Sequence, residues 1–371
     1  MSVSCPGLPP HPATAEPRPA AAGFVPAALA EATALAAGHE IPWPRDLRAH
    51  LEAGHFEPPP DNAILGPVAP RGGPNGLVLR HGILAARWGD TRRVDMTFSV
   101  AKSYLGLLAG LAWSDGLIPD LDEPVGRRVP DGGFEGPQNG AVTWRHLLQN
   151  SSEWEGTLFG KSEVIDRGRN LAVEGRGRKG VPRPLQAPGG YWEYNDVRVN
   201  RLALALLRVF RRPLPEVFAE RIMAPIGAST DWHWEGYETS WVEIEGKRMQ
   251  SVSGGGHWGG GVFIHAEDQA RIGQLVLQGG RWGGRQLVPE AWIGMSATPC
   301  ALNPQYGFLW WLNTGRARWP GASAATRCFV GAGGNLTWID PENDLVAVLR
   351  WTDPTRASDF MAAVTAAIRD S

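Results

Sequence analysis

A serine and a lysine three positions apart, Ser99 and Lys102, could together attack a carbonyl carbon. Residues i and i+3 share one face of a helix, so the lysine amine can reach the serine hydroxyl. A serine hydroxyl is a weak nucleophile until a neighbouring base accepts its proton. A lysine can be that base where burial among apolar side chains disfavours its ammonium form. The spacing therefore indicates a serine nucleophile with a lysine base.

The stretch after Lys102, YLGLLAGLAW, is apolar nearly all round and predicts a buried central helix ending near Gly116. Ser99 would stand in its first turn, where free backbone N–H groups favour negative charge on a nearby oxygen. The pattern alone is weak evidence, because a serine three residues before a lysine arises by chance about once in such a chain. In the alternative interpretation Ser99 is only an N-cap and Lys102 an exposed first-turn residue.

Elements on both sides of this helix predict a sheet to hold it. Residues 76–90 contain two short apolar runs separated by Arg-His-Gly, which is typical of a hairpin. Further strands are expected in YGFLWWLNT, TRCFVGAGG and LTWIDPENDLVAVLRW. Helices are expected at 24–38, 44–53, from 143, and at 195–210, 213–223 and 357–369. We therefore expect an α+β fold, an antiparallel sheet flanked by helices with an inserted, mainly helical subdomain.

The composition along the chain suggests three parts. Residues 1–22 are rich in Pro and Ala and are expected to form a flexible leader. Residues 23–115 and 205–371 would build the sheet domain. Residues 116–204, rich in Gly, Pro and charged side chains, would form a mainly helical, loop-rich insert over a site.

Charge and cysteine content exclude several classes of function. The 36 Lys and Arg against 38 Asp and Glu leave a net charge of −2, so neither nucleic acid nor an anionic membrane is an expected partner. No run of about 18 apolar residues predicts a membrane span, and no secretory signal is recognisable. Cys5, Cys300 and Cys328 suggest no disulfide framework. A cytoplasmic protein is expected, and its oligomeric state stays open.

No metal or cofactor is expected from the motifs. His55, His81, His146, His233 and His265 show no zinc-ligand spacing with Cys or carboxylates. The glycine cluster GGGHWGGG lacks the lysine and the strand–loop–helix pattern of a phosphate-binding loop.

Five blocks, in order, resemble the β-lactamase-related serine hydrolases, which include class C β-lactamases, DD-peptidases and related esterases and amide hydrolases. These blocks cover roughly residues 75–365. They are SVAKSYLGLLAGLAWSDGLIPDLDEPVGRRVP, TWRHLLQNSS, APGGYWEYNDVRVNRLALALL, SGGGHWGGGVFIHAEDQARIGQLVLQGGRWGGRQLVPEAWI and FVGAGGNLTWIDPENDLVAVLRW. The tail and the GGGHWGGG loop look most like the 6-aminohexanoate-dimer hydrolase type. The resemblance implies a β-lactamase/transpeptidase-like fold and a small-molecule ester or amide substrate.

The resemblance also implies roles for particular residues. Ser99 would form an acyl-enzyme, Lys102 would be its base, and Tyr194, in the Tyr-Asn-Asp sequence, would pass a proton to the leaving group. The backbone N–H groups of Ser99 and Ala332 would form the oxyanion hole. A tyrosine at a helix entry can equally be a core residue.

The register of the second oxyanion donor depends on which glycine ends the strand. Counting back from Asp340 and Pro341 gives Gly331, followed by Ala332, and a glycine there would let the backbone approach the acyl carbonyl. Gly333 or Gly334 could be the true position, and a simple bulge is the alternative.

Two residues depart from the family's pattern. Phe329 stands where β-lactamases and DD-peptidases have a lysine and many esterases a histidine, which argues against substrates whose carboxylate that cation binds. Asp196 replaces an asparagine, and an ionised carboxylate accepts hydrogen bonds without donating any. It could pair with the Lys102 ammonium, which would favour the charged form and count against a ready base.

Four more side chains are candidates for the pocket wall. His257 and Trp258 lie between two glycine runs, and His257 could instead be a hydrogen-bonded structural histidine. Glu155 and Phe159 belong to the loop-rich region and could equally be surface residues. The leading hypothesis is hydrolysis of a small ester or amide. A penicillin-recognising enzyme and a catalytically silent ligand-binding relative are the alternatives.

Overall fold

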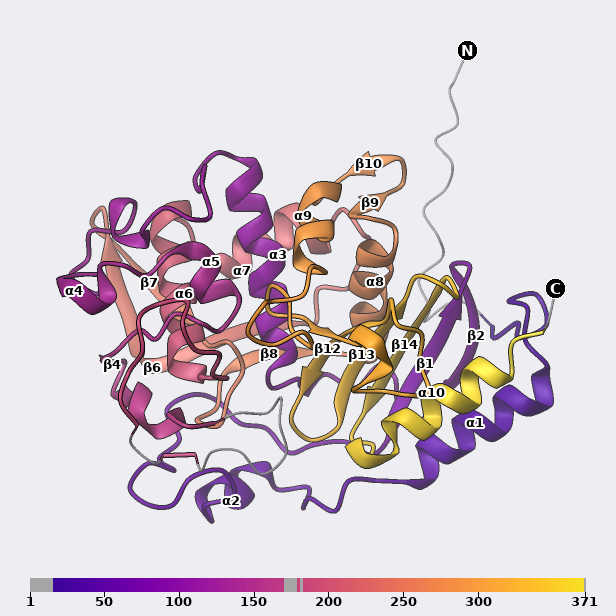
Figure 1. Cartoon of the computed structure of the whole chain (residues 1–371). Helices are drawn as coiled ribbons and strands as arrows, with labels where there is room; N and C mark the ends of the chain where they lie inside the picture. The colour runs from indigo at the N-terminus through magenta and orange to yellow at the C-terminus, as the bar shows by residue number, and fades with distance from the viewer. Residues whose placement is uncertain (1–15, 170–178, 181–182, 370–371) are drawn as a thin grey trace.

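The computed structural model describes residues 16–169, 179–180 and 183–369. A six-stranded sheet, in which all neighbouring strands are antiparallel, stands beside a group of helices (Figure 1). Its strands, in spatial order, are β11 (Trp311–Leu312), β12 (Arg327–Gly331), β13 (Asn335–Asp340), β14 (Leu345–Arg350), β1 (Asn75–Arg80) and β2 (Ile83–Trp88). The expected α+β fold with an antiparallel sheet is confirmed.

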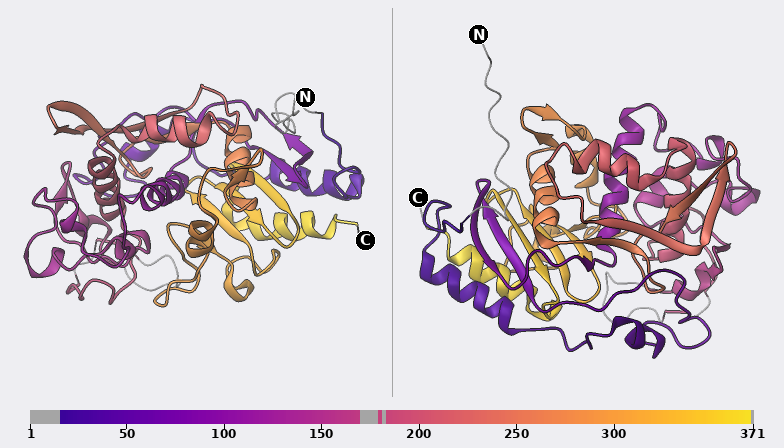
Figure 2. Two further views of the ribbon diagram at one scale, coloured as in Figure 1. Left: turned by 90° about the horizontal axis from the view of Figure 1, so that it is seen from above. Right: turned by 180° about the vertical axis from the view of Figure 1, so that it is seen from behind.

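Helices cover both faces of this sheet, so its strands are apolar on both sides. Along β1, Leu77 and Leu79 pack towards α8 (Ala266–Leu277), whereas Val78 packs with the other face. That face is covered by α1 (Pro26–Gly38) and α10 (Ala357–Ala366), which lie side by side in Figures 1 and 2. The alternation follows from the period of two of a β-strand.

A second sheet connects the first to the helical side of the molecule. Its strand order is β3 (Asp95–Met96), β8 (Gly261–Ile264), β6 (His233–Ile244) and β7 (Lys247–Val252). Two short hairpins are β4 (Thr157–Leu158) with β5 (Lys161–Ser162) and β9 (Arg281–Trp282) with β10 (Arg285–Gln286). The remaining α-helices are α2 (Leu47–Glu52), α3 (Val100–Ser114), α4 (Gly136–Asn139), α5 (Trp144–Leu148), α6 (Asp196–Phe210), α7 (Leu214–Phe218) and α9 (Glu290–Ser296). Single turns are η2 (Val125–Arg127), η3 (Glu163–Asp166), η4 (Ala219–Met223), η5 (Thr314–Arg316) and η6 (Pro354–Arg356).

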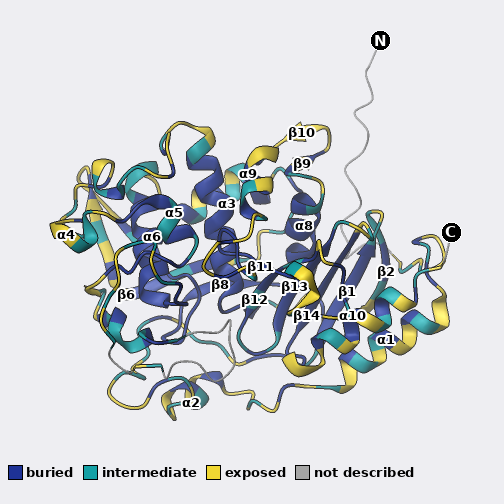
Figure 3. Cartoon of the chain, viewed as in Figure 1, coloured by how far each residue is buried: buried dark blue, intermediate teal, exposed yellow. Residues whose placement is uncertain are grey.

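Helix α3 runs through the centre and is buried over most of its length (Figure 3). Its two glycines admit neighbours that a larger side chain would exclude. A Cβ on Gly110 would lie 2.5 Å from the indole of Trp292, whose Nε1 donates to the carbonyl of Gly106 at 2.9 Å. The sequence GLLAG therefore lets α9 press directly on the central helix.

The predicted parts of the chain can be compared with this arrangement. Residues 1–15 of the expected leader lie outside the described residues, and the N–H of Arg18 donates to the carbonyl of Leu84 in β2. The boundary expected at residue 204 falls inside α6, which packs with α3, α5 and β7. None of the described helices combines the length and apolar character that crossing a bilayer requires.

Arg350, at the end of β14, connects the two sheets. Its guanidinium donates to the carbonyls of Met96 in β3 and Ile264 in β8, at 3.0 and 2.9 Å. It also donates to the side-chain oxygen of Asn335 in β13, at 2.6 Å. Only 1% of Arg350 is exposed, so water could not donate to these acceptors in place of the guanidinium. The turn that leads into α3 is thereby held against the large sheet.

We expect Arg350→Met to lower the free energy of unfolding by about 3 kcal/mol, because several buried acceptors would lose their donor. Urea unfolding followed by circular dichroism would measure the change. Arg285→Met, on the exposed hairpin β9–β10, removes the same charge from the surface and should change stability by less than about 0.5 kcal/mol. Equal losses in the two variants would contradict the bracing role of Arg350.

Candidate active site

The turn between β3 and α3 presents Ser99 at the start of the helix. Phe98, just before it, has a left-handed φ of 51°, a conformation that non-glycine residues adopt rarely and that concentrates at functional sites. Gly255 packs against this turn so closely that a Cβ there would lie 1.9 Å from the Phe98 carbonyl oxygen. The glycine at 255 is therefore a steric requirement of the turn that carries Ser99.

Lys102 lies against Ser99 as the spacing predicts. Its Nζ donates to the Ser99 Oγ at 2.7 Å, and only 1% of the lysine is exposed. The same ammonium donates to the carbonyls of Gly254 and Gly255, each at 3.2 Å. The Ser99 side chain caps no backbone N–H of α3. The alternative of a helix-capping serine beside an exposed lysine is therefore wrong.

Asp196 supplies the negative charge beside this lysine. One carboxylate oxygen forms an ion pair with Lys102 Nζ at 2.7 Å, and the other lies 3.3 Å from Arg169. Burial alone would raise the pKa of the carboxyl. The neighbouring Lys102, His257 and Arg169 nevertheless hold that pKa well below its ordinary value. Asp196 is thus ionised, as the pairing considered from the sequence requires.

Helix α6 positions both Asp196 and the glycine loop. Asn195 caps the helix by accepting from the N–H of Arg198, which places Asp196 in the first turn. One turn later, the side-chain oxygen of Asn200 accepts from the N–H of Gly254 at 2.9 Å. Helix α6 therefore positions both Asp196 and the glycine loop whose carbonyls contact Lys102.

Tyr194 lies beside the Lys102 amine. The Nζ of Lys102 is 5.3 Å from the centroid of the tyrosine ring, and the guanidinium carbon of Arg169 is 5.1 Å from it. The ring stacks on Trp311 with centroids 5.6 Å apart. Tyr194 is 3% exposed and Ser99 is 9% exposed, so both side chains are buried. Hydroxyl, amine and phenol thus gather in one place.

The end of strand β12 passes directly over the start of α3. A Cβ on Gly331 would lie 2.0 Å from the carbonyl oxygen of Thr97 and 3.2 Å from the backbone nitrogen of Ser99. Gly333, by contrast, belongs to the turn between β12 and β13 and faces the ring of Trp351. Among the three glycines considered, Gly331 is the one against the nucleophile, which favours Ala332 as the next backbone donor.

His257 lies behind the site rather than in an open pocket wall. It is 3% exposed and bridges two carboxylates, with Nε2 3.2 Å from Asp196 and Nδ1 2.7 Å from Glu57. Burial lowers the pKa of the imidazole, and the neighbouring Asp196 and Glu57 carboxylates act in the opposite direction. A hydrogen-bonded structural histidine, the alternative considered from the sequence, describes this environment.

Glu57, Asp166 and His257 lie close enough together to hold a cation. Lys179 fills that place with its ammonium group, which contacts Glu57, lies 3.1 Å from Asp166 and 3.0 Å from His257 Nδ1. The pKa of Asp166 lies below its ordinary value despite burial, chiefly because Lys179 is near. A lysine satisfies these ligands, so we assign no metal to them.

The other proposed pocket residues lie elsewhere. Trp258 is fully buried, and its Nε1 donates to the carbonyl of Asp61 at 2.8 Å. The Glu155 N–H donates to the Asn139 side chain in α4, and Phe159 lies in the β4–β5 turn (Figure 1). The structure thus brings none of these three side chains to Ser99.

Phe329 occupies the strand position at which the family has a cation. It is completely buried and packs edge-on against Tyr104 of α3. Its ring centroid lies 5.5 Å from that of Trp310. The position is therefore part of the core and supplies no charge to a substrate.

Several residues that shape the site have no sequence signal of their own. Glu57 and Arg169 are ordinary charged residues in loops, and their partners His257 and Asp196 lie 200 and 27 positions away. Asn200 is one of several buried polar residues of α6, together with Asp196, Arg198 and Arg201. The one sequence feature that could have pointed to Asn200 is a polar residue at a helix position expected to be buried.

Residues 88–369, well over half of the chain, match the family described as Beta-lactamase. The chain therefore belongs to the beta-lactamase family, whose fold is shared by serine hydrolases that include esterases, amidases and penicillin-binding proteins. The resemblance seen in the sequence is confirmed. No match was found among the sequences of curated proteins.

Solved structures of several kinds share this fold. A penicillin-binding protein homologue from Caulobacter crescentus is 16% identical, with a TM-score of 0.58 over 87% of this chain and 98% of that chain. EstCE1, a hydrolase with promiscuous acyltransferase activity, is 16% identical, with a TM-score of 0.57 over 92% and 99%. A candidate 6-aminohexanoate-dimer hydrolase from Bacillus anthracis is 17% identical, with a TM-score of 0.55 over 79% and 78%. At these identities the likeness establishes the fold alone.

We expect Asp196→Asn to lower the free energy of unfolding by about 3 kcal/mol at neutral pH, because buried Lys102 and Arg169 lose a carboxylate. The folded-state pKa of Asp196 lies below the unfolded value of about 3.9, so its contribution is complete above that value. The contribution is lost as pH falls towards the folded-state pKa. In urea unfolding, the gap between the two proteins should stay constant down to about pH 5 and narrow below about pH 4.

Asp122→Asn is the matched control for this experiment. Asp122 pairs with Arg145 at 2.6 Å, but the side chains are 60% and 36% exposed. A surface pair of this kind contributes about 1 kcal/mol or less. A pH-independent gap for Asp196→Asn, or one no larger than that of the control, would refute the buried ion pair.

Proposed function

We propose that this protein hydrolyses a small ester or amide through an acyl-enzyme on Ser99. The observation that carries the proposal is the 2.7 Å contact between the buried Lys102 amine and the Ser99 hydroxyl at the start of α3. A buried amine in contact with a serine, with a phenol close by, is a set of groups that can catalyse covalent acyl transfer.

In the proposed first step the Lys102–Tyr194 pair lacks one proton; Ser99 Oγ attacks the substrate carbonyl carbon, and the serine proton passes to that pair. Tyr194 then gives a proton to the departing alcohol or amine, leaving the acyl group on Ser99. Water attacks the ester carbonyl in turn, loses its proton to the same pair, and restores the serine.

The negative charge that develops on the carbonyl oxygen needs donors fixed in advance. The N–H groups of Ser99 and Ala332 are the proposed donors, supported by the close approach of Gly331 to the Ser99 nitrogen. The N-terminus of the 15-residue helix α3 favours the same charge. Asp196 acts by holding the Lys102 amine in place through the 2.7 Å ion pair.

An ester or a non-lactam amide is the preferred substrate class. Phe329 is buried where penicillin-recognising relatives need a cation, so the usual partner of a penicillin carboxylate is missing at that position. Turnover of nitrocefin, or covalent labelling by a fluorescent penicillin, at rates comparable to ester hydrolysis would favour a penicillin-recognising enzyme instead.

Ser99→Ala and Lys102→Ala should each reduce kcat/KM for p-nitrophenyl esters by at least about a thousandfold without unfolding the protein. A series of acyl chain lengths, with short ω-amino-acid amides beside it, would find the preferred substrate. Ser114→Ala, at the exposed end of the same helix, is the matched control and should keep full activity. Undiminished hydrolysis by Ser99→Ala would eliminate the nucleophile. Absence of turnover in the wild-type protein would favour a silent relative.

Tyr194→Phe should leave a small residual rate that depends on the leaving group. A p-nitrophenolate departs without being protonated, whereas an alkoxide needs a proton from Tyr194, a transfer typically worth about a hundredfold or more. The variant should therefore lose more activity on an ethyl ester than on the p-nitrophenyl ester of the same acid. Equal losses on both esters would contradict the role of Tyr194 as the acid for the leaving group.

A further inference from the structure

The segment that carries α2 packs against the turn before Ser99. Within this segment, residues 39–57, which we call the strap, the ring of Trp43 lies edge-on to that of Phe98 with centroids 5.8 Å apart. The ring of Phe56 is also edge-on to Phe98, at 6.2 Å. Phe98 is 1% exposed and has the left-handed φ of 51°. Because such a backbone conformation persists only where the surrounding structure enforces it, the strap helps to hold the nucleophile in place.

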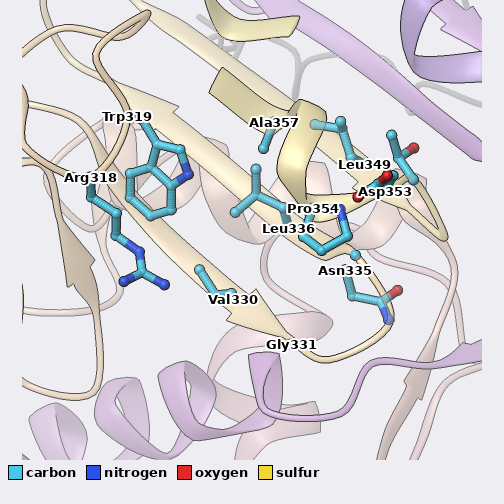
Figure 4. Close-up of a pocket in the computed structure, with 12 residues that line it drawn as sticks. Arg318, Trp319, Val330, Gly331, Asn335, Leu336, Leu349, Asp353, Pro354 and Ala357 are labelled. Atoms are coloured by element: carbon cyan, nitrogen blue, oxygen red, sulfur yellow. The ribbon is translucent and has the colours of Figure 1, made fainter. Parts of the chain in front are cut away.

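The start of the strap is tied to the chain after β14. The N–H of Ile41 donates to the carbonyl of Trp351 at 2.9 Å, and the N–H of Asp353 donates to the carbonyl of His39 at 2.8 Å. Asp353 lines a cavity whose wall also includes Gly331, the glycine that packs on the nucleophile turn (Figure 4). This end of the strap is therefore fixed by the large sheet.

The other end of the strap contacts the charged network behind the site. The ring of Phe56 stacks on that of His257 with centroids 4.1 Å apart, and the Glu57 carboxylate lies 2.7 Å from His257 Nδ1. His257 in turn lies 3.2 Å from Asp196. A shift of the strap would therefore reach the site both through the turn before the nucleophile and through this histidine.

Two histidines face each other within the strap. The ring centroids of His50 and His55 are 4.1 Å apart, and they lie 5.1 and 4.5 Å from the ring of Trp43. His50 Nε2 is buried, and in the part of the chain that the structure describes neither imidazole has a hydrogen-bond partner. Two imidazoles at this distance pack against each other while they are neutral, but two imidazolium ions would repel each other.

The groups that face this pair mostly oppose its protonation. Burial and, to a smaller extent, Arg71 in the loop before β1 lower the pKa of His50. Burial, His50 and His257 lower the pKa of His55, whereas Glu57 raises it. Both imidazoles therefore take up protons less readily in the folded strap than they would in water.

The other charged groups of the strap have partners of their own. The Glu57 carboxylate contacts Lys179 as well as the histidine behind the site. On α2, Arg48 pairs with Glu52 at 2.9 Å, and the Asp46 side chain accepts from a backbone N–H as the helix cap. These carboxylates are therefore already engaged when the histidines become charged.

We propose that the strap is a pH-sensitive support of the nucleophile turn, which loosens when His50 and His55 take up protons. The folded-state pKa of each histidine lies below the unfolded value of about 6.5. The contribution of the neutral pair is therefore complete above that pH and is lost as the pH falls through the lower folded-state values.

Loosening of the strap acts on the site through Phe98. Without the rings of Trp43 and Phe56, the left-handed conformation of Phe98 loses contacts that enforce it, and the Ser99 hydroxyl loses its position beside Lys102. This effect on hydrolysis rests on the proposed function, whereas the loosening itself does not.

Hydrogen–deuterium exchange measures the strap directly. After correction for the pH dependence of chemical exchange, the protection of peptides from residues 39–57 should fall about tenfold or more between about pH 7.5 and about pH 5. Peptides from the buried helix α8 should keep their protection over the same range. Wild-type protection of the strap that does not change with pH would overturn the proposal.

Substitutions that keep the rings but remove their titration test the role of the histidines. The double variant His50→Phe, His55→Phe should show equal protection at both pH values. Either single variant, which suffices if the double variant does not fold, should lose less protection than the wild type. His233→Phe is the matched control, because His233 stacks on Phe263 at 4.6 Å outside the strap, and it should show the wild-type loss. A loss in the double variant equal to that of the wild type would refute the histidine pair.

Ester hydrolysis tests whether the strap acts on Ser99. The kcat/KM of the wild type, divided by that of the double variant, should fall about twofold or more between about pH 7.5 and about pH 5.5, because the loosened state is less competent. An unchanged ratio despite a loosened strap would refute the coupling to the nucleophile. If no ester is hydrolysed at any pH, the proposed function fails, and the exchange result decides the pH response of the strap by itself.

Discussion

The ammonium group of Lys102 is the point at which the parts of the site meet. It contacts the Ser99 hydroxyl on its own helix, the Asp196 carboxylate on α6, and the carbonyls of Gly254 and Gly255 in the glycine loop. A buried charge is stable only if it is paired and hydrogen-bonded. Each of these segments must therefore bring its polar group within contact distance of the same amine, and this arrangement fixes the position of Ser99.

The charged groups around Lys102 form a network that extends from Asp196 to Glu57. Asp196 is shared by Lys102, Arg169 and the imidazole of His257. His257 in turn contacts Glu57, which lies 200 positions earlier in the sequence. In such a buried network the loss of one member leaves its neighbours unpaired. The network thus couples the nucleophile helix to loops that contribute no reacting atom.

The periodic elements were predictable from sequence because their signals are local. The apolar run after Lys102, the hairpin at 76–90 and the helix after Asn195 appear as α3, β1–β2 and α6. The strand expected in YGFLWWLNT shrinks to Trp311–Leu312, because the backbone turns at Leu309, which has a left-handed φ of 59°, and Tyr306 bridges back to Trp311. The long β6–β7 hairpin was not predicted, since its exposed face gives an irregular pattern.

By itself the sequence determined the family, the fold class and the candidate trio of Ser99, Lys102 and Tyr194, because motif spacing and hydrophobic period are properties of neighbouring residues. Only the tertiary structure decided that His257 lies buried between two carboxylates and that Trp258 belongs to the core. Burial and charge pairing are set by segments far apart in the chain. No local pattern encodes which of them arrive together.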